Sequence, residues 1–166
     1  AAGALNVQQN VSANGTGAVD LRTTSGDLTI STGKKIESTG TGTIQLVVGA
    51  GSILVDGSSA TLELISGGDV LLNVSAGVGS NTTNALDLNA TQLAVSAGAP
   101  GVYAREATGL NITTVTGLNG QGNLSGIATA GNGEIYLSAA GALNVQQNVS
   151  ANGTGAVDLR TTSGDL

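Results

Sequence analysis

Residues 1–28, AAGALNVQQNVSANGTGAVDLRTTSGDL, return without a single change as residues 139–166. The 166-residue chain is therefore one 138-residue period followed by the first 28 residues of the next. Self-similarity at a fixed period is typical of repeat proteins, whose units stack on their neighbours. We expect residues 1–166 to form one continuous segment of a longer tandem array, and we expect the function to belong to that array.

The core has to be built almost without aromatic residues. The chain contains no Phe, Trp, Met, Cys or His, and Tyr103 and Tyr136 are its only aromatic residues, although 40% of its residues are hydrophobic. Val, Ile, Leu and Ala must fill the interior, which favours a narrow and regular core. The lack of Cys and His excludes disulfides, thiolate metal sites and the usual proton shuttle at neutral pH.

The charge balance limits the classes of partner. Eleven acidic and five basic residues give a net charge of −6, whereas nucleic-acid binding needs a basic surface. No apolar run approaches the ~20 residues of a membrane-spanning helix. We therefore expect no nucleic-acid partner, no membrane span and no cofactor.

Short apolar–x–apolar triplets recur in pairs and predict the fold. Within each pair the second triplet begins 7 to 9 residues after the first, and glycine or small polar residues lie between them. Alternation with a period of two indicates strands, and the intervening residues indicate turns. The first triplets begin at Val19, Ile44, Leu62, Leu86, Val102 and Ile135, and the second at Leu28, Ile53, Val70, Leu93, Leu110 and Leu143.

Six pairs in one period give a mean of 23 residues per pair. This pattern predicts an all-β fold, a parallel β-helix (β-solenoid) with about six coils per 138-residue period, in which each coil stacks on the previous one. Neighbouring strands lie ~4.8 Å apart, so six coils would advance ~29 Å. Thr113 to Asn132 contains no clean triplet pair, and we expect either a seventh, irregular coil or a projecting loop there.

Three runs carry a resemblance to a known group of proteins: SGDLTIST (25–32), ISGGDVLLNVSAG (65–77) and GNGEIYLSAAGALNVQQNVSANGTG (131–155). They resemble the repeats of giant secreted bacterial adhesins, the filamentous-haemagglutinin-like proteins, and the resemblance covers the whole chain. It implies that the β-helix is right-handed, that the protein is exported to the cell surface, and that it serves in attachment or in surface fibres. It transfers no catalytic residue to this chain.

The middle residues of the first triplets are expected to face outward in one column. Glu63 and Asp87 would then lie on adjacent coils, near the ~5 Å carboxyl separation of retaining glycosidases. Clustered carboxylate oxygens also suit Ca²⁺. A solvated face explains them more simply, as it does Arg105 and Glu106, so we expect a protein that is not an enzyme and has no firm metal site.

The two tyrosines occupy equivalent positions on successive coils. Tyr103 and Tyr136 are expected to stack side by side, which indicates either packing between coils or an aromatic platform that binds sugar.

Nine asparagines are followed at the second position by Ser or Thr, the acceptor pattern for N-linked glycans. Either these sites are modified on an exported fibre, or the pattern is a by-product of Asn and Thr in turns and hydrogen-bonding ladders. The nine are Asn10, Asn14, Asn73, Asn81, Asn89, Asn111, Asn123, Asn148 and Asn152.

The sequence favours a structural function. Identical consecutive repeats supply length, so the chain is interpreted as part of the shaft of an extracellular fibre, with neighbouring repeats as end-to-end partners and lateral self-association as a further contact. The alternative is an adhesive segment that binds a glycan or cell-surface ligand through weak sites repeated in every period.

Overall fold

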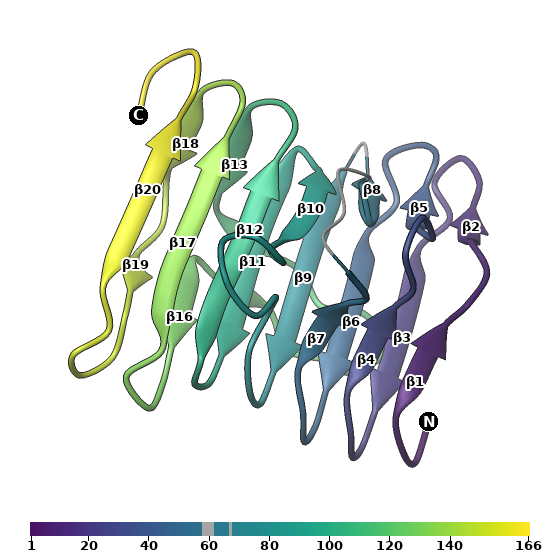
Figure 1. The fold of residues 1–166 in the computed structure, drawn as a ribbon. Coiled ribbons are helices and arrows are strands. Elements are labelled where there is room, and N and C mark those ends of the chain that lie inside the picture. Colours follow the sequence, from purple (N-terminus) through teal and green to yellow (C-terminus); the bar gives the residue numbers. More distant parts are fainter. Residues whose placement is uncertain (58–61, 67) are drawn as a thin grey trace.

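The computed structural model describes residues 1–57, 62–66 and 68–166 (Figure 1). Within these residues the chain is all-β, and no helix occurs. Every pair of strands is parallel except one short hairpin, and the strands of successive parts of the chain lie side by side from the N-terminal to the C-terminal end (Figure 1). Stacked parallel strands are consistent with the predicted β-solenoid, and this part of the prediction is confirmed.

The strands form three parallel sheets and the hairpin. The three-stranded sheet contains β1 (Leu5–Val7), β4 (Leu28–Ile30) and β7 (Ile53–Val55). The seven-stranded sheet contains β2 (Val11–Ala13), β5 (Ile36–Ser38), β8 (Leu64–Ser66), β10 (Leu86–Asn89), β12 (Gly101–Glu106), β17 (Glu134–Ala139) and β20 (Val157–Thr161). The eight-stranded sheet contains β3 (Val19–Thr23), β6 (Ile44–Val48), β9 (Asp69–Val74), β11 (Gln92–Ala97), β13 (Leu110–Ile112), β16 (Ile127–Thr129), β18 (Leu143–Val145) and β19 (Val149–Ser150). The hairpin consists of β14 (Thr114–Val115) and β15 (Leu124–Ser125).

One aliphatic core runs through the stack. Alternate residues of the strands point inward, so that Leu28 and Ile30 of β4 are fully buried while Thr29 between them is half-buried. A single strand has too little neighbouring surface to cover such residues. They are covered when the next strand of the same sheet stacks on them, and burial of apolar area is then the main stabilising term.

The sequence patterns missed one strand position. β2 and β5 lie between one triplet pair and the next, so the N-terminal part of the chain places strands in three sheets rather than two. Each has one large apolar inward residue, Val11 or Ile36, but its second inward position holds a small residue, Ala13 or Ser38. Ser38 is buried and its hydroxyl donates to the carbonyl of Gly17 at 2.8 Å, which satisfies a polar group that the triplet pattern does not recognise.

The expected number of about six coils per period is slightly too high. We use "circuit" for the stretch of chain between a strand and the next strand stacked on it. In the eight-stranded sheet the residue beside Val19 is Ile44, followed by Val70 and Leu93. In the seven-stranded sheet Val102 is followed by Ile135 and Val157. One period, counted from Val19 to Val157, therefore begins with three circuits. A nine-residue step from Leu93 to Val102 then crosses from one sheet to the other, and two more circuits follow. The period holds about five and a half circuits in all.

The same sequence consequently lies in two different sheets. β3 and β20 both read VDLRT, yet β3 pairs with β6 in the eight-stranded sheet and β20 pairs with β17 in the seven-stranded sheet. With ~4.8 Å between strands, five and a half circuits advance ~26 Å per period rather than ~29 Å.

A change in strand length accounts for the exchange of sheets. The six-residue strand β12 takes the place of two short strands, because Val102 bridges to Val78 while Ala104 to Glu106 pair with β10. The preceding strand β11 does the opposite. Its residues Gln92 and Leu93 pair with β13, and its residues 95–97 pair with β16. Before this point the long strands lie in the eight-stranded sheet, and after it they lie in the seven-stranded sheet. The pairs of short strands change in the opposite direction.

Residues 113–126 form neither a seventh coil nor a projecting loop. They contain the antiparallel hairpin β14–β15, which folds back onto the outer side of the eight-stranded sheet, and the chain rejoins that sheet at β16. Val115 of the hairpin is buried against Leu71 and Ala94, and Leu124 packs on the same cluster. We call residues 113–126 the flap.

Candidate functional site

The flap covers a column of outward-facing residues. Asp20, Gln45, Leu71 and Ala94 stand beside one another on β3, β6, β9 and β11. We call them the covered column. Its apolar half, Leu71 and Ala94, meets the base of the flap, and its polar half, Asp20 and Gln45, meets the tip. Of these four, Asp20 and Gln45 are middle residues of first triplets and were expected to face solvent, but Gln45 is fully buried and Asp20 is only 13% exposed.

Hydrogen bonds hold the tip of the flap. The backbone N–H of Leu118 donates to Gln45 Oε1 at 2.7 Å, and Gln45 Nε2 donates to the carbonyl oxygen of Leu118 at 3.3 Å. Arg22 Nη2 donates to the same carbonyl at 2.7 Å, and Asn119 Nδ2 donates to Asp20 Oδ2 at 2.7 Å. Because Gln45 is fully buried and uses both ends of its amide, it fixes the position of the tip.

Asp20 is a charged anchor of this contact. Its carboxylate is 2.9 Å from Arg22 Nε. Burial raises the pKa of Asp20, but the hydrogen bonds from Arg22, Asn119 and Gln45 outweigh it and hold the pKa below its ordinary value. The carboxylate is therefore ionised when it receives the flap.

A second column lies on the outer side of the seven-stranded sheet. Tyr103, Tyr136 and Asp158 stand beside one another on β12, β17 and β20. We call them the open column, because the two tyrosine side chains are partly exposed. The hydroxyl of Tyr103 donates to Glu134 at 2.8 Å, and the guanidinium carbon of Arg160 lies 5.5 Å from the centre of the Tyr136 ring. That distance is within the range of a cation–π contact.

Glu63 and Asp87 meet in a buried and charge-paired arrangement. The backbone N–H of Asp87 donates to Glu63 Oε2 at 2.7 Å. Arg105 donates to both oxygens of Asp87, with distances of 2.6 and 3.0 Å. Glu63 is 2% exposed and Asp87 is 7% exposed, so the expectation that they form a solvated face is wrong.

Burial also perturbs Asp87. It raises the pKa of this carboxyl, and the hydrogen bonds and charge of Arg105 oppose the rise. Asp87 is thus engaged by Arg105 and by its place beside Glu63. Among the described residues no group of three or more acidic, His or Cys side chains is arranged to hold a metal ion.

Glu106 was expected to be a solvated charge, but it is 3% exposed, so that expectation is wrong. Its oxygens accept from the backbone N–H groups of Ala90 and Thr108 and from the Thr108 hydroxyl, each at 3.0 Å. Burial raises the pKa of Glu106 to about 7, although these hydrogen bonds oppose the rise. Its place two and four positions after the inward residues Ala104 and Val102 is the signal that could have identified it.

The nine predicted acceptor asparagines fall into two groups. Six are exposed in turns or in the flap: Asn10, Asn14, Asn81, Asn123, Asn148 and Asn152. Three are half-buried within strands: Asn73, Asn89 and Asn111. Asn144 Nδ2 donates to Asn111 Oδ1 at 3.0 Å, and Asn81 Oδ1 accepts two backbone N–H groups of its own turn. Ladders and turns of this kind account for part of the asparagine content.

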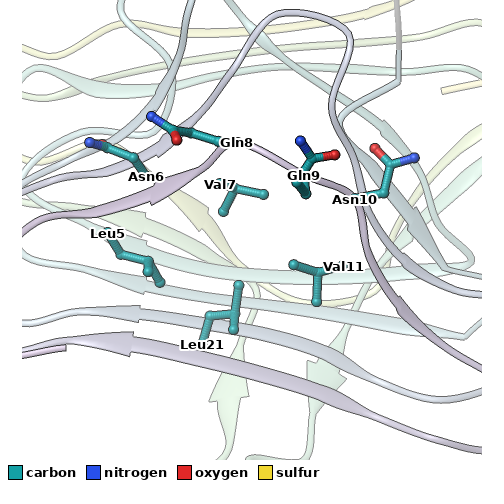
Figure 2. A pocket seen from close by; sticks show the side chains of 8 residues that line it. All are labelled: Leu5, Asn6, Val7, Gln8, Gln9, Asn10, Val11 and Leu21. Atoms are coloured by element: carbon teal, nitrogen blue, oxygen red, sulfur yellow. The ribbon is translucent and has the colours of Figure 1, made fainter.

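The core is open at the N-terminal end of the stack. A hollow of about 330 Å³ lies there, and Figure 2 shows Val7, Val11 and Leu21 pointing into it. The strands β1, β2 and β3 are the first of their sheets, so this is the side on which a preceding circuit would stack. The remaining lining residues are Leu5, Asn6, Gln8, Gln9 and Asn10.

The two identical segments are covered from opposite sides. Val19 is 6% exposed, whereas its counterpart Val157 is 47% exposed. The relation reverses at another position, since Leu143 is buried while its counterpart Leu5 is only half-buried. Each copy therefore lacks the neighbour that the other copy has.

No family model, curated protein or solved structure matches the chain. None of its described residues belongs to a helix that could span a membrane.

Proposed function

We propose that the chain is a segment of the shaft of an extracellular bacterial surface fibre, a right-handed parallel β-helix built from tandem 138-residue periods. The observation that carries the proposal is the opposite covering of the two identical segments. A preceding period would fill the hollow at Leu5 and Val7, and a following one would cover Val145 and Val157. Both ends are then the interior of a longer stack.

The physical role of such a shaft is reach. Each period adds ~26 Å of length by repeating one narrow core. Stacking also pairs the open edges of β3 and β20, which would otherwise template unwanted strand pairing. This function needs no catalytic group, and it is consistent with Asp20, Glu63 and Asp87 serving internal contacts.

The number of periods is the variable that tests this proposal. Chains of one, two and three periods, each followed by residues 1–28, are compared by small-angle scattering. A shaft predicts a constant cross-section and a length that rises by ~26 Å per added period. Growth in cross-section, or compact beads joined by linkers, would overturn it. Protease shaving of intact cells tests exposure of the parent protein at the surface.

A second function is favoured by the open column. Tyr103 and Tyr136 lie in register and partly exposed, with Arg160 and Glu134 beside them, and such a surface suits weak binding of a sugar ring. We test it with a glycan array probed by the single-period chain and by Tyr136→Ala. Reproducible binding that the substitution removes would favour the adhesive function. Equal signals from both proteins would count against it.

A further inference from the structure

Two identical charged pairs differ in what covers them. Asp20 and Arg22 on β3 are 13% and 37% exposed, whereas Asp158 and Arg160 on β20 are 40% and 61% exposed. The first pair is covered by the flap and flanked by the next stacked strand, β6, and the second pair has neither of these neighbours. The sequence around the two pairs is the same over all 28 residues.

The flap binds far from its own place in the chain. It leaves the stack after β13 and passes β11, β9 and β6 before its tip reaches β3, so Asn119 contacts a residue 99 positions earlier. Asp20 and Arg22 belong to the 28-residue segment with which a period begins. The flap of a period therefore clamps the first long strand of that same period.

We propose that Asp158 and Arg160 form the docking site for the flap of the following period, a segment with the sequence TTVTGLNGQGNLSG of residues 113–126. The proposal rests on the proposed shaft. It identifies the occupant by its chemistry: a backbone carbonyl that accepts from Arg160, as Leu118 accepts from Arg22, and an amide that donates to Asp158, as Asn119 donates to Asp20.

The second site is already arranged like the first. Arg160 Nε lies 2.8 Å from Asp158 Oδ1 and its Nη2 lies 2.6 Å from Asp158 Oδ2, and Arg22 holds Asp20 through the same two nitrogens. Docking thus requires little rearrangement of the pair. Because β20 lies in the seven-stranded sheet, the incoming flap covers the opposite side of the stack from the first flap. Successive flaps would alternate sides, and each would lie on the face that carries the tyrosines of the preceding period.

The experiment compares the reaction of arginine side chains with phenylglyoxal, measured by mass spectrometry. In the 166-residue chain Arg160 should react faster than Arg22, since it is the more exposed of the two. In a chain lengthened by one period, we expect the rate at Arg160 to fall to that of Arg22. Arg105 serves as an internal reference whose surroundings do not change.

A matched variant separates the flap from simple stacking. The lengthened chain is also made with alanine at the second-period counterparts of Val115, Asn119 and Leu124, which keeps the circuits but removes the apolar base of the flap and the amide at its tip. Arg160 should regain its fast reaction there while the rod keeps its length. An intact rod with Arg160 equally protected in both chains, or unprotected in both, would overturn the docking site and leave the shaft standing. A lengthened chain that forms no rod would instead refute the proposed function.

Discussion

Val19 and Val157 allow one substitution to be compared at two places in an identical sequence. Both valines begin a VDLRT strand, so their local unfolded-state contributions cancel when Val19→Ala is compared with Val157→Ala. Removal of two buried methyl groups costs about 1.5 kcal/mol, and the cavity left behind adds to this cost. Val19 is 6% exposed and carries the full loss, whereas Val157 is 47% exposed and should lose about half as much.

The free energy of unfolding is measured by urea titration with circular dichroism near 218 nm, alongside amide hydrogen exchange of both end circuits, because ends of a stack open separately. The expected difference between the variants is about 1 kcal/mol, with Val19→Ala the less stable. In a chain lengthened by one period, Val157→Ala should become as costly as Val19→Ala. Equal losses in the 166-residue chain, or a larger loss at Val157, would refute the opposite covering of the two copies.

Four further outcomes are expected. Arg22→Ala should speed amide exchange at Leu118 and lower the free energy of unfolding by about 1–2 kcal/mol, while the matched Arg160→Ala should leave the stability unchanged; similar effects of both would contradict the flap contact. Glu106 has an ordinary pKa of 4.5 and a pKa of about 7 in the folded chain. Folding thus favours its protonated form, so stability present below pH 4.5 is lost as the pH rises through 7, by about 3 kcal/mol. Glu106→Gln should flatten that dependence, and an unchanged slope would show that another group causes it. The open ends should make the 166-residue chain associate end to end, and sedimentation as a monomer that persists at all concentrations would count against this. Peptide mass spectrometry of the native fibre should decide the glycan hypothesis, which is wrong if all nine asparagines are unmodified.

The sequence was sufficient to predict the parallel stacking and the aliphatic core. The triplets that begin at Ile44 and Leu28 indicate strands because each has two apolar residues that point inward. The structure confirms that these inward residues are buried. The strand β5 escaped notice because Ser38 satisfies an inward position by a hydrogen bond to Gly17 rather than by apolar burial. A pattern of apolar residues alone cannot recognise such a strand.

The half circuit and the covered sites depend on contacts between distant parts of the chain. A triplet looks the same in whichever sheet it lies, so the exchange of sheets between Leu93 and Val102 has no local signature. The burial of Asp87 depends on Arg105, which follows 18 residues later. The flap could not be predicted either, because it packs on strands that are distant in the sequence. The apolar residues Val115 and Leu124 within a polar run were a signal that this segment packs on an apolar surface.

Cryo-electron microscopy of a chain of three periods tests the central claim most directly. A continuous stack of parallel strands with an axial advance of ~26 Å per period is predicted, and the flaps should lie on alternate sides so that the full repeat is ~53 Å. An advance of ~29 Å with every flap on the same side would contradict the half circuit. A break in the strand stacking after β20 would contradict the tandem shaft itself.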